Sequence, residues 1–552
     1  MKVKLIIFLL LISSLMMAEV LLLDVMFTND IHGGIDRYAA TFMNPEYPPM
    51  LGGGAAAAAY IKSVRQQKSD NRDNLLFDDG DFFQGHPVGT MTQGKAVIEY
   101  FNMIDYDLSV IGNHEYDIGE EALMETLKDA EFPFLSCNIF RRGTDELVEY
   151  VQPYMIFEKM GIKIGVIGVT TTDTEQMSFP DHIKNVEFRA AKPAVEKYVK
   201  ILREDEKVDL VFVTGHLGLP YDPEPAYEHR YAEDKEPAER RWGYDAQEIA
   251  HEVEGIDVLF GGHMHKGFAQ AWEDPDTHTL VFQGYAYGSN VGHVILKIDP
   301  VTRTLMGYDT PAIREGVLVT LFEDEFIGDQ KIGDRIQEMQ DIAEEGMDEI
   351  VGESEVYLSR VGSGPQNVIG NLVCEAMLEY TDADFAFLNL GGIRADIKAG
   401  PVSYRDVFNV MPFDNQVVMM EVDGKFLKDI IEMRVSGGRH GLRVAGVEVI
   451  INRKNEDYDR VTSLLIGGEP WQADKIYKVA TTDFLLQGNA GLVMLTKIPE
   501  EQITRYEMDL REAIVDYIQN NSPVNVKIDN RWKRDDKSVK TPEMLKELQN
   551  LN

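Results

Sequence analysis

Short apolar runs that end in acidic or imidazole side chains beside a glycine most constrain the fold of this chain. Five such runs end in Asn29-Asp30-Ile31-His32, Gly80-Asp81, Gly112-Asn113-His114, Gly215-His216 and Gly262-His263-Met264-His265. In layered α/β sheets, ligands bind beyond the carboxyl ends of the strands, so these side chains are expected to converge. Glycine beside each cluster leaves room for the backbone to turn next to a bound ion. The pattern predicts an α/β fold around one polar site.

The first half of the chain alternates apolar runs with amphipathic stretches. The runs are rich in Val, Ile, Leu and Phe and alternate little, as in strands buried on both faces: 20–27, 74–77, 107–111, 163–169, 209–213 and 257–260. Residues 97–104 and 246–253 space their apolar side chains at helical intervals. Strands alternating with helices predict sheets covered on both faces. Residues 219–243 interrupt this alternation, and we interpret them as a surface loop, with a lid as the alternative.

A second domain is expected after residue 351. Residues 321–351 are acidic, with Ile332, Ile336, Met339, Ile342 and Met347 at helical intervals, which predicts a helix linking two domains. The second domain is expected to begin with a helix and to contain strands separated by glycines. The predicted order is a signal peptide at 1–18, a first domain at 19–320, the linking helix at 321–351, a second domain at 352–535 and a polar tail at 536–552.

The first 18 residues have the pattern of a secretory signal. A basic start precedes an apolar run that ends before Glu19 and is shorter than the roughly 20 residues of a membrane span. We therefore expect cleavage near Ala18 and a periplasmic or secreted protein without stable membrane association. Export leads to an oxidising compartment, but a core of this size needs no disulfide, so Cys137 and Cys374 are expected to be buried free thiols.

Composition excludes several classes of partner. Hydrophobic residues make up 44% and charged residues 27% of the chain, which fits a globular protein rather than a disordered one. Lys and Arg number 54 against 93 Asp and Glu, a net charge of −39 that repels phosphate backbones and anionic lipids. A nucleic-acid polymer is therefore not expected as a partner, whereas a small molecule is not excluded. The oligomeric state is left open.

Each polar motif by itself is a weak signal, but their combination predicts a metal site. A single histidine such as His216 is more often an ordinary core or surface residue. Carboxylate, imidazole and carboxamide groups together, without thiolate, favour a hydrolytic site that binds Mn, Zn, Fe or Co over a structural zinc site. Seven such side chains exceed the four ligands of one tetrahedral ion. We therefore expect two divalent ions that share one bridging carboxylate.

The ordered motifs resemble the calcineurin-like dimetal phosphoesterases, and the second half resembles the secreted 5'-nucleotidase family, including bacterial periplasmic UDP-sugar hydrolase/5'-nucleotidases. The matching segments are Asn-Asp-Ile-His-Gly, Gly-Asn-His-Glu-Tyr-Asp, Gly-Gly-Ile-Arg394, Pro-Phe413-Asp-Asn415 and Phe484. The resemblance implies a four-layer α/β/β/α phosphoesterase domain and a second α/β domain for nucleotide specificity. It assigns Asp30, His32 and His265 to one metal, Asn113, His216 and His263 to the other, and Asp81 as the bridge.

The same resemblance implies a mechanism. His114 would be the catalytic histidine, paired with Asp117, and together they would stabilise the transition state of in-line attack by metal-bound hydroxide on phosphorus. The implied activity is removal of phosphate from 5'-nucleotides, with UDP-sugars as a further substrate class.

In the second domain, the resemblance gives specificity to five residues. Phe413 and Phe484 would stack on the base, Arg394 would contact phosphate oxygens, and Asn389 and Asn415 would bind the base.

The chain departs from the family at one position of the nucleotide site. The sequence Gly488-Asn489-Ala490-Gly491 places Ala490 where the family has an aspartate for the ribose hydroxyls. Two alternative activities therefore stay open: a 2',3'-cyclic nucleotide 2'-phosphodiesterase, or a broader phosphomonoesterase. A non-catalytic nucleotide-binding module is a third hypothesis, and the complete set of predicted ligands disfavours it.

Overall fold

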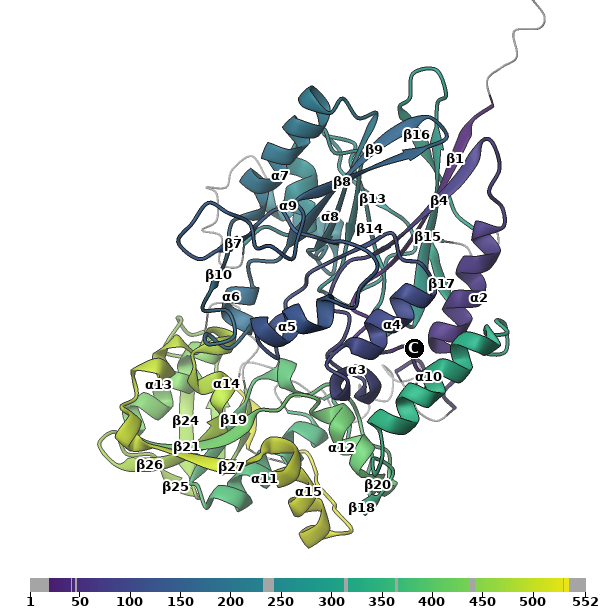
Figure 1. Cartoon of the computed structure of the whole chain (residues 1–552). Coiled ribbons are helices and arrows are strands. Elements are labelled where there is room, and N and C mark those ends of the chain that lie inside the picture. Colours follow the sequence, from purple (N-terminus) through teal and green to yellow (C-terminus); the bar gives the residue numbers. More distant parts are fainter. Residues whose placement is uncertain are drawn as a thin grey trace, which may run out of the picture. The chain divides into compact units, whose positions relative to one another are not determined.

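The computed structural model divides into two compact units between Glu344 and Glu345 (Figure 1). It describes residues 19–535 except 41, 45–46, 232–242, 312–315, 363–365, 437–441 and 530. The predicted signal peptide at 1–18 and polar tail at 536–552 lie outside the described residues. Within the described part of the chain, no helix has the length and apolar character needed to cross a membrane.

Two stacked sheets form the centre of the N-terminal unit. The first contains, in order, β16 (Leu305–Asp309), β15 (Asn290–Ile298), β1 (Leu21–Thr28), β4 (Arg72–Asp78), β5 (Leu108–Val110) and β6 (Phe134–Leu135), with β17 (Leu318–Thr320) also on β15. The second contains β13 (Trp272–Glu273), β14 (Leu280–Gln283), β12 (Val258–Gly261), β11 (Leu210–His216), β9 (Ile162–Thr170) and β8 (Tyr154–Lys159). In the first sheet β1, β4, β5 and β6 are parallel, and in the second β9, β11, β12 and β14 are parallel. All six predicted strands are confirmed.

Fully buried side chains alternate between the faces of each sheet. On β1, Val25 and Phe27 face the core between the two sheets, where the ring of Phe27 lies 5.2 Å from that of Phe260. Met26 faces the opposite way, into the core beneath the helices on the outer face of the first sheet. This alternation gives each sheet two apolar faces, so helices must cover both outer sides.

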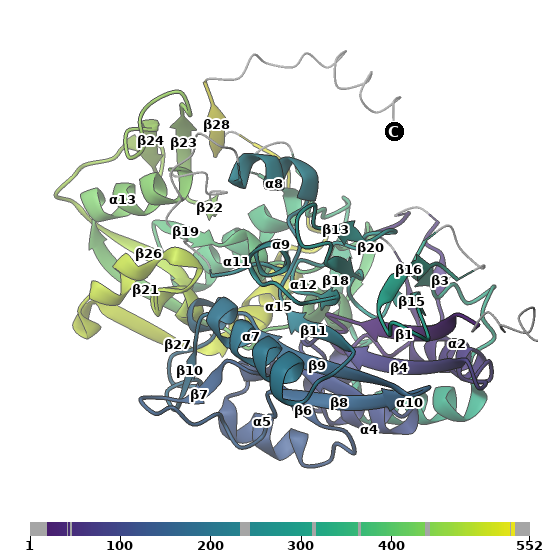
Figure 2. The same ribbon diagram turned by 90° about the horizontal axis from the view of Figure 1, so that it is seen from above.

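Helices complete four layers, which confirms the predicted α/β/β/α architecture. The outer face of the first sheet is covered by α2 (Gly53–Arg65), α3 (Pro87–Met91), α4 (Lys95–Met103) and α5 (Glu120–Leu127). The outer face of the second is covered by α7 (Ala191–Lys200) and α9 (Ala246–Glu252), as Figures 1 and 2 show. Smaller elements complete the unit: the ribbons β2 (Tyr38–Ala39) with β3 (Met50–Leu51) and β7 (Ile139–Arg141) with β10 (Val186–Phe188), and α6 (Thr174–Met177).

Part of the segment 219–243 is a helix rather than a loop, which corrects the sequence interpretation. Helix α8 (Pro223–Arg230) packs against α9: the rings of Tyr231 and His251 lie 4.1 Å apart, and Arg230 forms an ion pair of 2.7 Å with Asp245. Pro223 is favourable in the first turn of a helix. The apolar and polar residues of α8 are not separated onto two faces, so apolar periodicity does not predict the helix.

The predicted acidic helix is α10 (Gln330–Ala343), and it belongs to the N-terminal unit. Ile332, Ile336 and Met339 are buried in the core that α10 shares with α2 and α4, whereas Ile342 is 78% exposed. The C-terminal unit begins with strand β18 (Ile350–Ser354), not with a helix, because this short segment pairs with β20 (Gly400–Ser403).

The C-terminal unit packs helices around one mixed sheet. Its strands are β22 (Arg443–Ala445), β19 (Phe385–Leu388), β26 (Ile476–Thr482), β21 (Gln416–Asp423) and β27 (Ile503–Asp509). A smaller sheet contains β25 (Glu469–Pro470), β24 (Val461–Ile466), β23 (Val447–Ile451) and β28 (Trp532–Arg534). The helices are α11 (Val368–Thr381), α12 (Tyr404–Val410), α13 (Gly424–Val435), α14 (Asp483–Leu486) and α15 (Leu510–Asn521). Cys374 on α11, like Cys137, is a buried free thiol, as expected.

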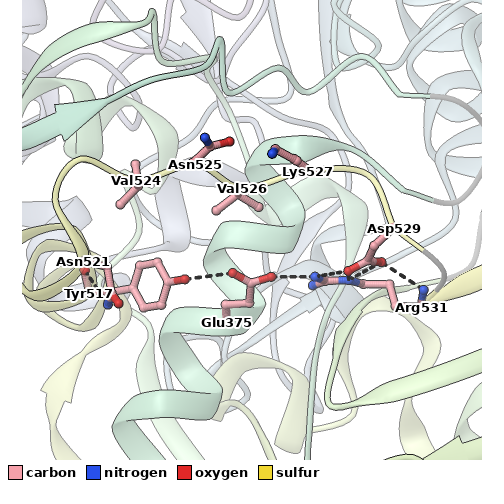
Figure 3. Close-up of a pocket in the computed structure, with 9 residues that line it drawn as sticks. All are labelled: Glu375, Tyr517, Asn521, Val524, Asn525, Val526, Lys527, Asp529 and Arg531. Carbon is pink, nitrogen blue, oxygen red and sulfur yellow. Dashed lines mark hydrogen bonds and ion pairs between the residues drawn. The ribbon is translucent and has the colours of Figure 1, made fainter.

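A chain of polar contacts fastens the last described segment to this unit (Figure 3). The Tyr517 hydroxyl on α15 donates to Glu375 on α11 at 2.8 Å, and Arg531 donates to Glu375 at 2.5 Å and to Asp529 at 2.6 Å. These groups line a pocket of about 300 Å³. In it, Arg531 forms ion pairs with both Glu375 and Asp529. The contacts hold the segment where β28 joins the smaller sheet.

One buried ion pair lies at the start of the first sheet. Asp24 on β1 is 1% exposed and accepts hydrogen bonds of 2.7 and 2.8 Å from Arg72 and one of 2.9 Å from His293. Tyr60 of α2 contacts the other ring nitrogen of His293 at 2.7 Å. Burial raises the pKa of Asp24, but His293 and Arg72 outweigh it and hold that pKa below its ordinary value.

We expect Asp24→Asn to lower the free energy of unfolding by about 3 kcal/mol at pH 7, because Arg72 loses its buried partner. Since the folded carboxyl has the lower pKa, its stabilisation is present at neutral pH and is lost as the pH falls below about 4. Urea unfolding of the wild type and the variant at pH 7 and at a pH below about 4 measures the difference in the free energy of unfolding. Asp70→Asn, on an exposed turn, is the control. A difference that persists unchanged in acid would contradict this account.

Candidate metal centre and active site

The first cluster of candidate ligands is Asp30, His32 and His265, whose ligand atoms lie within 4.8 Å of one another. Asp30 follows β1, and its Oδ1 lies 3.2 Å from His265 Nε2 and 3.9 Å from His32 Nε2. Its other oxygen accepts hydrogen bonds from the Asn29 side chain at 2.6 Å and the His263 N–H at 2.8 Å. One carboxylate oxygen is thus held by the protein and the other faces the imidazoles.

The second cluster is Asp81, His216 and His263. His216 is the last residue of β11, and Asp81 and His263 lie on the segments that follow β4 and β12. His216 Nε2 lies 2.9 Å from Asp81 Oδ2 and 3.3 Å from His263 Nδ1, while its Nδ1 contacts the Asp79 carbonyl at 2.9 Å. His216 Nε2 is also 3.9 Å from Asp30 Oδ1. The two clusters are therefore adjacent, as a pair of neighbouring ions would require.

Five of the seven candidate ligands have strained backbones. Asp30, His32, Asp81, His263 and His265 have φ values of 50°, 50°, 56°, 71° and 54°, in the left-handed region that disfavours residues with a Cβ. Strain of this kind costs of order 1–3 kcal/mol per residue and gathers at functional sites. Sequence analysis placed these residues at strand ends but could not predict their conformation.

The polar groups present fit a divalent cation. Asp30 Oδ1 and Asn113 Oδ1 are buried and find no hydrogen-bond partner among the residues that the structure describes. His32 and His265 bring their Nε2 atoms within 2.9 Å of each other, an arrangement that a shared cation stabilises. Carboxylate, imidazole and carboxamide donors without thiolate match the ligand chemistry of Mn, Zn, Fe and Co.

Electrostatics also favours a cation here. Burial raises the pKa values of Asp30 and Asp81, but the neighbouring imidazoles outweigh it, so both pKa values lie below the ordinary range of an aspartate. Burial lowers the pKa of His216, yet Asp81 and Asp30 outweigh it and raise that pKa to about 10. Both aspartates are therefore ionised at neutral pH, and their negative charge attracts positive charge into the site.

His114 lies beside the clusters but belongs to neither. The backbone N–H of His114 donates to Asp81 Oδ1 at 2.8 Å, and the centre of its ring lies 5.2 Å from that of the His32 ring. Nδ1 of His114 is 2.5 Å from Asp117 Oδ2, and burial raises the pKa of Asp117 even though His114 opposes the rise. The predicted His114–Asp117 pair is thus present, with the ring held through Nδ1.

Glu115 is a supporting residue that sequence analysis missed. Its fully buried carboxylate accepts backbone N–H bonds from Asp81 at 3.0 Å, Phe82 at 2.8 Å and Gly112 at 2.6 Å. It thereby joins the turn that carries Asp81 to the turn that carries Asn113. Its place next to His114 was the available signal, but only the fold shows which donors it reaches.

In the C-terminal unit, the structure brings together some of the predicted nucleotide-binding residues. The Arg394 guanidinium lies 5.7 Å from the centre of the Phe413 ring. The Gln416 N–H donates to Asp483 at 3.0 Å, which ties the segment after Phe413 to helix α14, where Phe484 lies. Phe413 and Phe484 are both half-buried against the core of this unit.

The predicted asparagines are placed differently. The Asn389 side chain lies over Gly392 of the turn that it begins, and Asn415 is buried two residues after Phe413. Among the described residues, no side-chain hydrogen bond joins either asparagine to Arg394 or to the segments of the two phenylalanines. Ala490 has φ 52°, and its carbonyl accepts a hydrogen bond of 2.5 Å from Arg434.

Comparison with known families agrees with both units. The calcineurin-like phosphoesterase family matches residues 23–267, and the 5'-nucleotidase C-terminal domain matches residues 350–497. The chain is therefore built from a calcineurin-like phosphoesterase domain and a 5'-nucleotidase C-terminal domain. It is therefore a metal-dependent phosphoric ester hydrolase, and the two clusters provide places for the two divalent ions that calcineurin-like phosphoesterases use.

Relatives align with this chain over nearly its whole length. A 5'-nucleotidase of Vibrio vulnificus is 27% identical over 91% of this chain and 91% of its own, and protein UshA of Escherichia coli is 26% identical over 92% of each. The crystal structure of a 5'-nucleotidase precursor from Thermus thermophilus covers 94% of this chain and 100% of its own, with a TM-score of 0.79 and 24% identity. This last likeness shows the fold.

Variants of Asp81 and His114 should separate metal binding from catalysis in this phosphoesterase. We expect Asp81→Ala to lose bound metal, because it removes a carboxylate shared by the site. His114→Ala should keep its metal and lower kcat by about 10²- to 10⁴-fold, the range for a group that transfers a proton. Elemental analysis and steady-state kinetics on the same samples measure both effects. Equal metal loss in the two variants would refute the placement of His114 outside the ligand set.

Proposed function

We propose that this protein removes phosphate from 5'-nucleotides as an exported enzyme, with UDP-sugars as a further substrate class. The observation that carries the proposal is the pair of adjacent carboxylate–imidazole clusters next to the His114–Asp117 pair. The relatives named 5'-nucleotidase, aligned over nearly their full length, support the nucleotide as substrate. The basic and apolar first 18 residues support export to the periplasm or the medium.

Seven residues would hold the two ions. In this proposal, Asp30, His32 and His265 bind one, Asn113, His216 and His263 bind the other, and Asp81 bridges them. When bound, the ions would neutralise phosphate oxygens and supply an activated water near neutral pH. The Asn29 and Glu115 contacts keep the two aspartates in place for this task.

His114 would act on the phosphoryl group. The Nδ1–H group of His114 donates a hydrogen bond to Asp117 and the ring is thereby fixed, so that Nε2 is the nitrogen left to meet substrate. A proton at Nε2 would stabilise the negative charge that grows on the phosphoryl oxygens and would then pass to the departing oxygen of the nucleoside. No covalent intermediate with the protein is needed.

The C-terminal unit would recognise the nucleoside. Arg394 over Phe413 combines a planar cation with an aromatic face, an arrangement suited to a base that carries phosphate nearby. Phe484 would provide the second aromatic surface, and Asn389 and Asn415 would bind the edge of the base. Ala490 offers no side-chain acceptor for the ribose hydroxyls, which favours tolerance toward the sugar.

A substrate panel tests the proposed activity. Protein loaded with Mn²⁺, Zn²⁺ or Co²⁺ should release phosphate from AMP faster than from p-nitrophenyl phosphate, and should also act on UDP-glucose. Faster turnover of 2',3'-cyclic AMP than of AMP would assign the cyclic phosphodiesterase activity instead. Binding of AMP without phosphate release by fully loaded protein would identify a non-catalytic binding module.

Phe413→Ala should raise KM for AMP by about 5-fold, because stacking contributes about 1 kcal/mol. KM for p-nitrophenyl phosphate should change less, since that substrate carries no nucleobase. Phe426→Ala, which alters another half-buried phenylalanine of the same unit, is the matched control. An equal rise in KM for both substrates would exclude a role of Phe413 in base recognition.

A further inference from the structure

Tyr287 shares the strained backbone of the candidate ligands. Its φ is 60°, in the left-handed region that a bulky side chain rarely adopts. Neither the sequence motifs nor the proposed chemistry includes this residue. An outlier of this kind persists only where its surroundings hold it firmly, and such outliers gather at functional sites.

Three contacts fix the Tyr287 backbone. Its N–H donates to the Asp30 carbonyl at 2.8 Å, and its own carbonyl accepts the Tyr38 hydroxyl at 2.8 Å. The same carbonyl packs so tightly on Gly34 that a Cβ there would lie 2.5 Å away. The strained conformation is therefore held by the turn that follows β1, the turn that also carries Asp30.

The Tyr287 side chain packs on imidazoles of the first cluster. Its ring centre lies 5.3 Å from that of His32 and 5.5 Å from that of His265, where the two rings are nearly perpendicular. On a further side, His86 stacks on Tyr287 at 5.9 Å, and His86 is itself bound to Asp36 at 2.7 Å. The Tyr287 ring is thus held by His86 while it also contacts His32 and His265.

We infer that Tyr287 is a positioning residue that orients His32 and His265 for the ion of the first cluster. This inference rests on the proposed metal assignment. His32 is also held by a contact of 2.6 Å between Nδ1 and the Gln84 carbonyl. The His265 side chain is 26% exposed, more than that of any other histidine in the two clusters, and the Tyr287 ring packs against it. Tyr287 contacts neither histidine of the second cluster through its ring.

The loss of metal affinity caused by removing the Tyr287 ring should be confined to one of the two ion sites. Partners that orient metal ligands typically change metal affinity by 10- to 100-fold. We expect Tyr287→Ala to weaken one Mn²⁺ site by at least about 10-fold and to leave the other unchanged. Tyr287→Phe should restore both sites, because the ring contacts and not the hydroxyl carry the effect.

Metal binding is measured directly by titrating metal-free protein with Mn²⁺ and counting free ion by electron paramagnetic resonance. His265→Ala, which removes a ligand of the same cluster, should give the same one-site pattern as Tyr287→Ala. Tyr285→Ala is the matched control: it lies two residues earlier in the same loop, its ring packs beside Gly267, and it should bind two ions like the wild type. Thermal unfolding of each metal-free variant checks that the fold is kept.

Two ions bound to Tyr287→Ala with wild-type affinities would overturn the inference, and so would equal weakening of both sites. Failure of Tyr287→Phe to restore binding would also overturn it. These results differ from a failure of the proposed function, in which the wild type itself would bind fewer than two ions or would bind two and release no phosphate from AMP.

Discussion

The burial of negative charge among imidazoles is the constraint on which the rest of the structure depends. Asp30 and Asp81 are almost completely buried, and burial alone would favour their neutral forms. His265 reverses that preference for Asp30 and His216 reverses it for Asp81, but within the described residues Asp30 Oδ1 has no hydrogen-bond donor. A buried carboxylate oxygen without a donor is costly, and a bound cation removes that cost. The site is therefore built for a charge that the chain itself does not contain.

Holding these side chains together strains the backbone, and surrounding hydrogen bonds compensate. The five candidate ligands with positive φ would relax toward ordinary conformations if their turns were free. Asn29 fixes one oxygen of Asp30, and Glu115 collects three N–H groups from two separate turns. The two sheets behind them are packed with phenylalanines such as Phe27 and Phe260, which gives the turns a rigid base.

Sequence patterns predicted the strands and the convergence of the metal-binding side chains for a simple reason. Parallel strands present their carboxyl ends at the same edge of a sheet, so Asp30 and Asp81 come close because β1 and β4 are neighbours in the first sheet. His216 ends β11 of the second sheet and reaches Asp81 because the two sheets are stacked. The patterns missed β18 (Ile350–Ser354), whose pairing with β20 is not encoded locally. They also missed α8 (Pro223–Arg230), which is stabilised by contacts with α9 rather than by its own periodicity.

The sequence by itself determined the α/β class and the chemistry of the candidate ligands, because both follow from residue type and from the pattern of apolar runs. The pairing of His114 with Asp117 was implied by the family resemblance rather than by a local pattern. Only the tertiary structure decided which carboxylate oxygen is free, which backbone turns are strained and that Tyr287 packs on His32 and His265. The contact of Tyr287 with His32 joins segments more than 200 residues apart, and no local pattern in one sequence records it.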